Sequence, residues 1–80
     1  MNLQKYDDCF IKVLDARKED LNEDYKFGTV DKWDSLAHLN LISELEDTFG
    51  IMFETDDITH FGGYENGKKI LSKYGVDLSA

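Results

Sequence analysis

The sequence has no proline and only one cysteine, Cys9. A domain built from many tight β-turns normally contains proline, so its absence favours helices over strands. A single cysteine can form neither an internal disulfide nor a metal site built on cysteine ligands. We expect Cys9 to be a small, partly buried side chain on a helix, because no neighbouring residue would clearly lower the pKa of its thiol.

Long apolar runs are missing as well. The longest ones are far too short to cross a bilayer, and no signal-peptide pattern opens the sequence. A hydrophobic content of 41% with ten aromatic residues nevertheless argues against disorder. We therefore expect residues 1–80 to form a single domain with a modest core, a cytoplasmic monomer that does not insert into membranes.

Basic residues are absent between Lys32 and Lys68. This segment holds eight acidic residues, whereas the rest of the chain holds nine acidic and nine basic ones, so the net charge of −8 belongs to the segment. Such a chain is a poor ligand for nucleic acid and a good one for basic proteins. Opposite charges four residues apart would stabilise a helix, so the one-sided pattern favours a binding surface over a merely solubilising face. The eight acids are Asp34, Glu44, Glu46, Asp47, Glu54, Asp56, Asp57 and Glu65.

Apolar spacing predicts a first helix over residues 3–16, with Asn2 as its N-cap. The inward side chains of this helix are Leu3, Tyr6, Phe10, Val13 and Leu14. A charged stretch over residues 18–32 shows no periodicity and is expected to be a long ordered loop. Isolated apolar residues are expected to pin this loop onto the core: Leu21, Tyr25, Phe27 and Val30.

The strongest periodicity predicts a second helix over residues 35–48 that ends near Gly50. The apolar residues of this helix recur in steps of three and four, which is typical of one buried helix face. They are Leu36, Leu39, Ile42, Leu45 and Phe49.

Two further helices are expected after it. A short third helix is predicted over residues 56–61, with Thr55 or Asp56 as its cap. The pair Gly62-Gly63 breaks it. A fourth helix is predicted over residues 64–73, because apolar spacing resumes there.

The fourth helix contains Gly67, which disfavours a helix by about 1 kcal/mol relative to alanine, so this helix is expected to start late. Its inward residues are Ile70, Leu71 and Tyr74, and Gly75 closes it. The chain is thus predicted to be an all-α four-helix bundle, with three main helices, a short third helix and a long loop between the first two.

Catalysis has little support in the sequence. Ser35 and His38, one helical turn apart, form the one imaginable nucleophile–base pair. No oxyanion-hole motif, glycine-rich phosphate loop or calcium-loop spacing accompanies them. We expect no catalytic residue and no metal site.

Ser35 stands where the second helix begins, directly after Asp34. A serine at this place is commonly an N-cap. A hydroxyl there also lies close to free backbone N–H groups and to the positive end of the helix dipole, where a phosphate is favoured. Asp34 could itself be the cap and leave the serine hydroxyl exposed, so a cap and an attachment site are both open for Ser35.

The stretch from Trp33 to Ile51 resembles the signature of acyl carrier proteins. It opens with Trp-Asp-Ser-Leu and closes with Leu-Glu-Asp-Thr-Phe-Gly-Ile, and the size, acidity and helix order of the whole chain are similar to that family. The resemblance implies a four-helix bundle of acyl-carrier type. It also implies that Ser35 is esterified by 4′-phosphopantetheine, delivered from coenzyme A by a phosphopantetheinyl transferase with magnesium.

The same resemblance implies a carrier rather than an enzyme. The thiol of the arm would hold an acyl group as a thioester for partner enzymes of fatty-acid, polyketide or other specialised biosynthesis. The transferase would recognise Asp34 and Leu36. The basic docking patches of acyl-loading and acyl-transfer enzymes would meet Leu36, Glu44, Glu46, Asp47 and Met52. Such charge steering favours fast encounter and weakens with salt.

Some positions depart from the fatty-acid carriers and favour a stand-alone, specialised member of the family. Ala37 and Asn40 stand where those carriers often have acids, and His38 lies between them. An aminoacyl or peptidyl carrier is the alternative within the carrier class. From other classes, a small acidic helical adaptor without a prosthetic group and a minimal hydrolase stay open.

Overall fold

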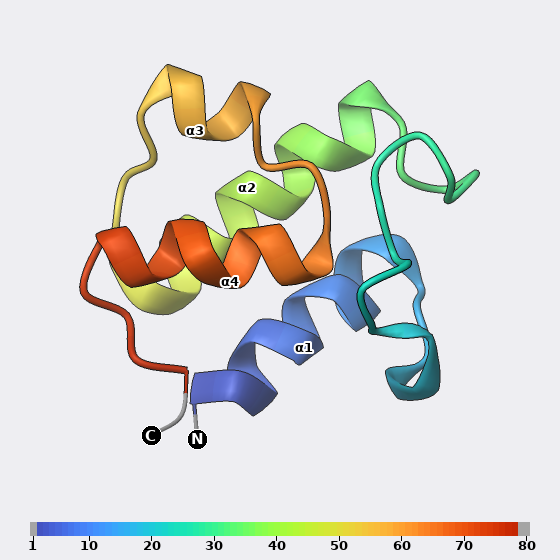
Figure 1. Ribbon diagram of the computed structural model, residues 1–80, viewed down its shortest axis with the longest axis horizontal. Helices are drawn as coiled ribbons and strands as arrows, with labels where there is room; N and C mark the ends of the chain where they lie inside the picture. The colour runs from blue at the N-terminus through green and yellow to red at the C-terminus, as the bar shows by residue number, and fades with distance from the viewer. Residues whose placement is uncertain (1, 79–80) are drawn as a thin grey trace.

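Four α-helices account for most of residues 2–78, the part of the chain that the computed structural model describes (Figure 1). Within this range there is no strand, only an isolated bridge between Lys26 and Gly63. The all-α prediction with a short third helix and a long loop is therefore confirmed. The helices are α1 (Asn2–Leu14), α2 (Ser35–Phe49), α3 (Thr55–Thr59) and α4 (Tyr64–Lys73), with a short 3-10 helix η1 (Lys18–Asp20) after α1.

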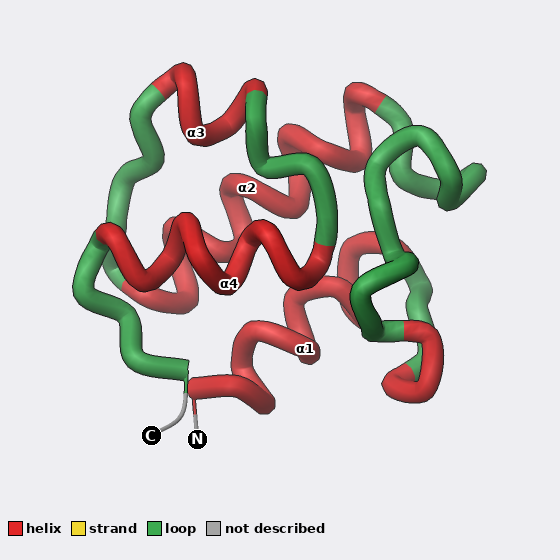
Figure 2. The backbone as a smooth tube through the Cα atoms, viewed as in Figure 1, coloured by secondary structure: helices red, strands yellow, loops and turns green. Residues whose placement is uncertain are grey.

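The helices are joined by loops of very different length. Figure 2 shows the long connection between α1 and α2 gathered at one end of the bundle, beside the start of α2. The other connections are short. None of the helices in residues 2–78 is long and apolar enough to cross a membrane.

The core is built from the inward faces of α1, α2 and α4 around a set of aromatic rings. The ring of Phe10 lies 5.0 Å from Tyr6 and 5.5 Å from Trp33, edge-on to both, which is a favourable arrangement for aromatic pairs. Burial of each such side chain contributes about 1.5–3 kcal/mol. Other buried members of the core are Leu14, Leu41, Ile42, Leu45, Phe53, Phe61, Ile70 and Leu71.

The predicted buried face of α2 is only partly right. Leu36 and Leu39 are exposed, whereas Ala37 is half-buried, and so is the polar side chain of His38. Its ring nitrogens have partners inside the fold, so the polar ring is accommodated there at little cost. The inward stripe consists of His38, Leu41, Ile42 and Leu45, which also has helical spacing.

The start and end of the predicted helices need several corrections. α1 ends at Leu14, because Asp15 adopts a positive φ of 53°. Asn2 lies inside α1 rather than capping it, and its amide donates to the carbonyl of Asp77. α3 begins one residue earlier and ends two residues earlier than predicted, and its N-cap is Glu54, without a side-chain capping hydrogen bond, rather than Thr55 or Asp56. The end of α2 is confirmed, since Gly50 takes the left-handed conformation.

Gly67 does not delay the start of α4, which begins at Tyr64 as the spacing predicts. A Cβ at this position would collide with the hydroxyl of Tyr6 and with the ring of Phe61. The glycine therefore lets α4 approach α1 closely, and this packing outweighs its poor helix propensity.

A buried polar network also joins α1 to α4. The hydroxyl of Tyr64 donates to Oδ1 of Asp7 over 2.5 Å, and the hydroxyl of Tyr6 donates to the carbonyl of Tyr64 over 2.6 Å. Burial, followed by the neighbouring carboxylate of Asp7, raises the pKa of Tyr64 well above its usual value. The buried carboxylate thus has a partner, as buried charge requires.

The long loop is fixed onto the junction between α3 and α4. The backbone N–H of Phe27 donates to the carbonyl of Gly62, and that of Tyr64 donates to the carbonyl of Tyr25. The side chain of Tyr25 is buried, as predicted, and Leu21 and Val30 are half-buried. Phe27 is not part of the core, since 44% of it is exposed. Gly28 beside it has a φ of 97°, so the chain turns there and carries Phe27 toward the start of α2.

Candidate functional site

Ser35 is the first residue of α2 and is exposed. The N-cap is Asp34, whose Oδ1 accepts a hydrogen bond from the backbone N–H of Ala37 over 2.8 Å. Among residues 2–78 the hydroxyl of Ser35 has no hydrogen-bond partner. The cap that sequence alone could assign to either residue therefore belongs to Asp34, and the serine hydroxyl is left free.

The backbone around Ser35 suits a phosphate ester. The first N–H groups of a helix have no acceptor inside it. Asp34 satisfies that of Ala37, which leaves those of Ser35 and Leu36 without a backbone acceptor in the described part of the chain. They lie at the positive end of a fifteen-residue helix. The donors present thus fit a phosphodiester on the Ser35 oxygen.

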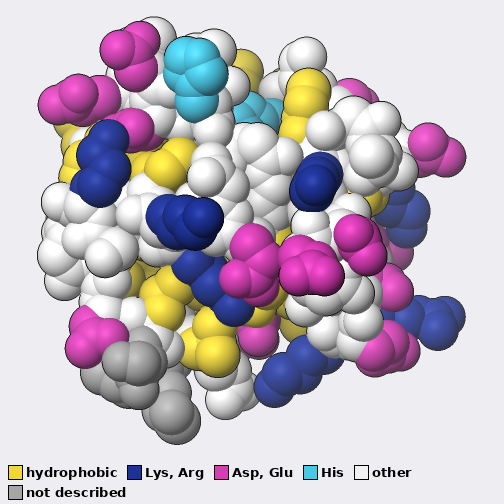
Figure 3. Space-filling view, viewed as in Figure 1, with side chains coloured by type: hydrophobic (Ala, Val, Ile, Leu, Met, Phe, Trp, Pro, Cys, Tyr) yellow, Lys and Arg dark blue, Asp and Glu magenta, His cyan; other side chains and the backbone are white. Residues whose placement is uncertain are grey.

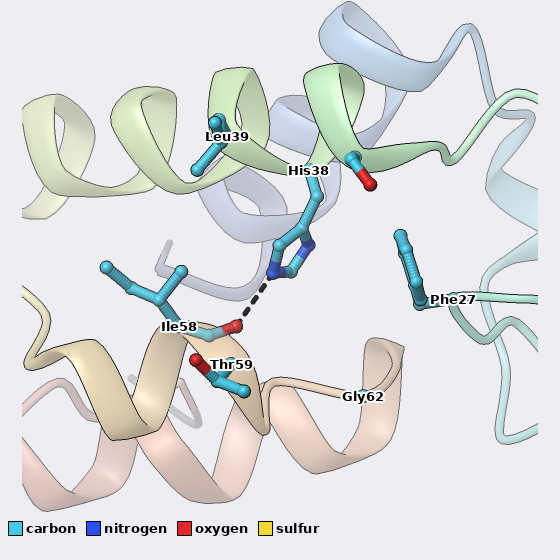
Figure 4. A pocket seen from close by; sticks show the side chains of 7 residues that line it. Phe27, His38, Leu39, Ile58, Thr59 and Gly62 are labelled. Atoms are coloured by element: carbon cyan, nitrogen blue, oxygen red, sulfur yellow. Dashed lines mark hydrogen bonds between the residues drawn. The ribbon is translucent and has the colours of Figure 1, made fainter.

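A pocket of about 340 Å³ lies next to Ser35 (Figure 4). Its walls come from three parts of the chain that the fold brings together: the long loop, the first turns of α2, and α3 with the segment after it. Most of the pocket surface is apolar, with Phe27, Leu39 and Ile58 as its apolar side chains, and this is typical of small-molecule pockets. The lining residues are Phe27, Ser35, His38, Leu39, Ile58, Thr59 and Gly62.

His38 is held by hydrogen bonds at both ring nitrogens. The indole N–H of Trp33 donates to Nδ1 over 3.0 Å, and Nε2 lies 2.8 Å from the carbonyl of Ile58 (Figure 4). Indole can only donate and a carbonyl can only accept, so Nδ1 is unprotonated and Nε2 carries the hydrogen. Neither nitrogen is then available to take a proton from Ser35, which speaks against the hydrolase alternative.

Asp34, Ser35 and Leu36 lie together at the start of α2, and Leu36 is 70% exposed. Asp47 is also exposed and stands eleven residues after Leu36, about three turns along the same side of the helix. Met52, beyond the end of α2, is 81% exposed. The exposed part of α2 therefore combines apolar and acidic side chains.

The other two predicted acids already have partners within the chain. Glu44 is half-buried and forms an ion pair with Lys12 of α1 over 3.3 Å. Glu46 accepts a hydrogen bond from the backbone N–H of Phe53 over 2.9 Å. Both residues thus support the packing of the helix and its exit loop.

Basic residues from outside the base-free segment approach several of its acids. Lys73 pairs with Asp57 over 2.8 Å, and Lys68 pairs with Glu65 over 3.1 Å. Figure 3 shows that the face formed by α1 and α4 carries side chains of both signs. Lysine side chains therefore neutralise part of the negative charge of the base-free segment. Asp47, on the exposed side of α2, has no such partner in residues 2–78.

Sequence reasoning missed several residues of the pocket. Phe27 was expected in the core, and Ile58 and Thr59 were assigned only to a short helix. The Trp33–His38 pair carried a usable signal, because a tryptophan and a histidine five residues apart straddle the start of a helix. The partner of the His38 ring on α3 is the backbone carbonyl of Ile58, and no sequence pattern predicts a contact with a backbone carbonyl.

Comparisons with protein-family models, curated proteins and solved structures gave no match. A functional conclusion therefore depends on the site itself. Within residues 2–78 its elements are a free hydroxyl at the start of a long helix, unpaired backbone N–H groups beside it, and an adjacent apolar pocket.

Proposed function

We propose that this protein is an acyl carrier protein that bears 4′-phosphopantetheine on Ser35. The observation that carries the proposal is that Asp34, and not Ser35, caps the start of α2. Asp34 caps the helix, and the hydroxyl of Ser35 is exposed and without a partner in residues 2–78. A serine that served as the cap would instead hold its own oxygen against the helix backbone.

The order and relative length of the described helices also support the proposal. A long loop precedes the helix that begins with Ser35, and a short helix α3 precedes the last one. This arrangement supports the proposal together with the resemblance of residues 33–51.

The chain's own residues would present the group rather than transform it. The N–H groups of Ser35 and Leu36 would face the phosphodiester, and the thiol at the end of the arm would supply the thioester chemistry. The exposed side chain of Leu36 and the carboxylate of Asp34 would be read by the transferase. Asp47 and Met52 would contact acyl-loading and acyl-transfer enzymes with basic docking patches, while Glu44 and Glu46 would take part less directly.

A small acidic adaptor without a prosthetic group would use the same exposed side of α2. The two proposals differ in one reaction. Incubation with coenzyme A, magnesium and a broad-specificity phosphopantetheinyl transferase, followed by intact-mass measurement, should add one phosphopantetheine to the carrier and nothing to the adaptor. The aminoacyl alternative shares the attachment site and differs only in the cargo.

A further inference from the structure

The inner wall of the pocket beside Ser35 is the imidazole of His38. Its ring lies 5.5 Å from Phe27, 5.8 Å from Phe61 and 6.0 Å from Trp33. The hydrogen bond from its Nε2 to the carbonyl of Ile58 joins the first turns of α2 to α3. The ring thus stands between the pocket and the interior of the bundle.

Aromatic side chains fill the interior behind His38. Trp33 and Phe61 are buried with their ring centres 6.3 Å apart, and Phe53 meets Phe61 edge-on at 6.2 Å. A group that entered this region past His38 would have to separate the ring from its two partners. That would leave the indole N–H of Trp33 and the carbonyl of Ile58 unpaired in an apolar surrounding, which is strongly disfavoured.

We propose that His38 is a specificity-determining residue that bars the group carried on Ser35 from the interior of the bundle. This inference rests on the proposed carrier function. The pocket of about 340 Å³ outside His38 has room for the first part of an acyl chain, and the methylenes that outgrow it would gain no further burial. The cargo class that the site favours is therefore a short or medium-length acyl group rather than a long aliphatic one.

The test compares unfolding midpoints of the protein loaded from acetyl-, butyryl-, octanoyl- and myristoyl-coenzyme A, with loading verified by intact mass. The myristoyl form should unfold within about 2 °C of the octanoyl form, because the methylenes that outgrow the pocket stay in solvent. His38→Ala removes the ring and leaves a space toward the interior, so its myristoyl form should unfold at least about 5 °C above its octanoyl form. His60→Ala, a change at the exposed histidine of the same chain, should behave as the wild type.

The results distinguish failure of the barrier, failure of the role of His38 and failure of the carrier function. A wild-type midpoint that keeps climbing from octanoyl to myristoyl would overturn the barrier, and equal midpoints of these two forms in folded His38→Ala would overturn the role of His38. If His38→Ala does not unfold cooperatively, Trp33→Phe keeps a ring in place and removes one bond to His38. That variant should then show a chain-length dependence, and a flat series would contradict the proposal. Absence of any mass gain would instead refute the carrier function itself.

Discussion

The indole N–H of Trp33 donates to Nδ1 of His38 over 3.0 Å, and this bond fixes the state of the histidine ring. Because the hydrogen of the neutral ring must then lie on Nε2, the carbonyl of Ile58 on α3 receives it. Trp33 and His38 therefore tie the loop before α2, the first turns of α2 and α3 into one unit around Ser35.

The first prediction concerns the tautomer of His38. Long-range ¹H–¹⁵N correlation spectra should place the hydrogen of the neutral ring on Nε2, because Trp33 can only donate to Nδ1. Trp33→Phe should weaken this preference, whereas His60 should be unaffected. A ring of His38 with its hydrogen on Nδ1 would show that the bond to Trp33 is not formed.

A second prediction separates the cap from the attachment site. Asp34→Ala should lower the free energy of unfolding by about 1 kcal/mol, because it removes the acceptor of the Ala37 N–H. Ser35→Ala should change it by less than about 0.5 kcal/mol, as expected for an exposed side chain without a partner in residues 2–78. Urea unfolding of both variants measures this, and the reverse order of effects would make Ser35 the cap.

A third prediction tests the close approach of α4 to α1. Gly67→Ala should destabilise the protein by about 1–3 kcal/mol, although alanine is the better helix former, because its Cβ would meet Tyr6 and Phe61. Ser72→Ala, an exposed position on the same helix, should stay within about 0.5 kcal/mol of the wild type. Chemical denaturation measures both, and a stabilised Gly67→Ala protein would disprove the contact.

These contacts also show how far sequence alone could reach. Helix positions followed from apolar spacing, and the candidate role of Asp34 as cap followed from residue chemistry. The inward face of α2 followed only in part, because Ile42 and Leu45 are buried as expected whereas Leu36 and Leu39, on the same apolar stripe, are exposed. In the first turns of α2 the ring of His38 faces inward instead and has two hydrogen bonds there, one of them to a backbone carbonyl.

The expected late start of α4 at Gly67 was wrong, because it rested on helix propensity alone. Helix propensity describes a residue in isolation, whereas the contact of α4 with Tyr6 joins residues 61 positions apart, Tyr6 and Gly67. The same holds for the pocket beside Ser35, whose walls come from the loop, α2 and α3. Long-range pairings of this kind leave little trace in local patterns.

A fourth prediction concerns pH and the contact between α3 and α4. Hydrogen bonds from Lys73 and then Tyr74 lower the pKa of Asp57 below its usual value of about 3.9. A carboxyl group that is more acidic in the folded state stabilises the fold above its unfolded pKa, and this stability is lost as pH falls through the folded pKa.

The free energy of unfolding should therefore fall as pH drops below about 4. This slope should be shallower in Asp57→Asn and intermediate in Tyr74→Phe, which removes one of the two donors. Urea unfolding at a series of pH values provides the comparison, with Ser72→Ala as a neutral control. Equal slopes in Asp57→Asn and wild type would show that the contact does not contribute.

The most direct test of the carrier function is the reaction of the purified protein with coenzyme A, magnesium and a phosphopantetheinyl transferase. Intact mass should rise by one phosphopantetheine, and peptide mass spectra should place it on Ser35. Ser43→Ala, an exposed serine on the same helix, should be modified as the wild type is, and Ser35→Ala should remain unmodified. An unchanged mass beside a competent control carrier, or a gain that persists in Ser35→Ala, would contradict the proposal.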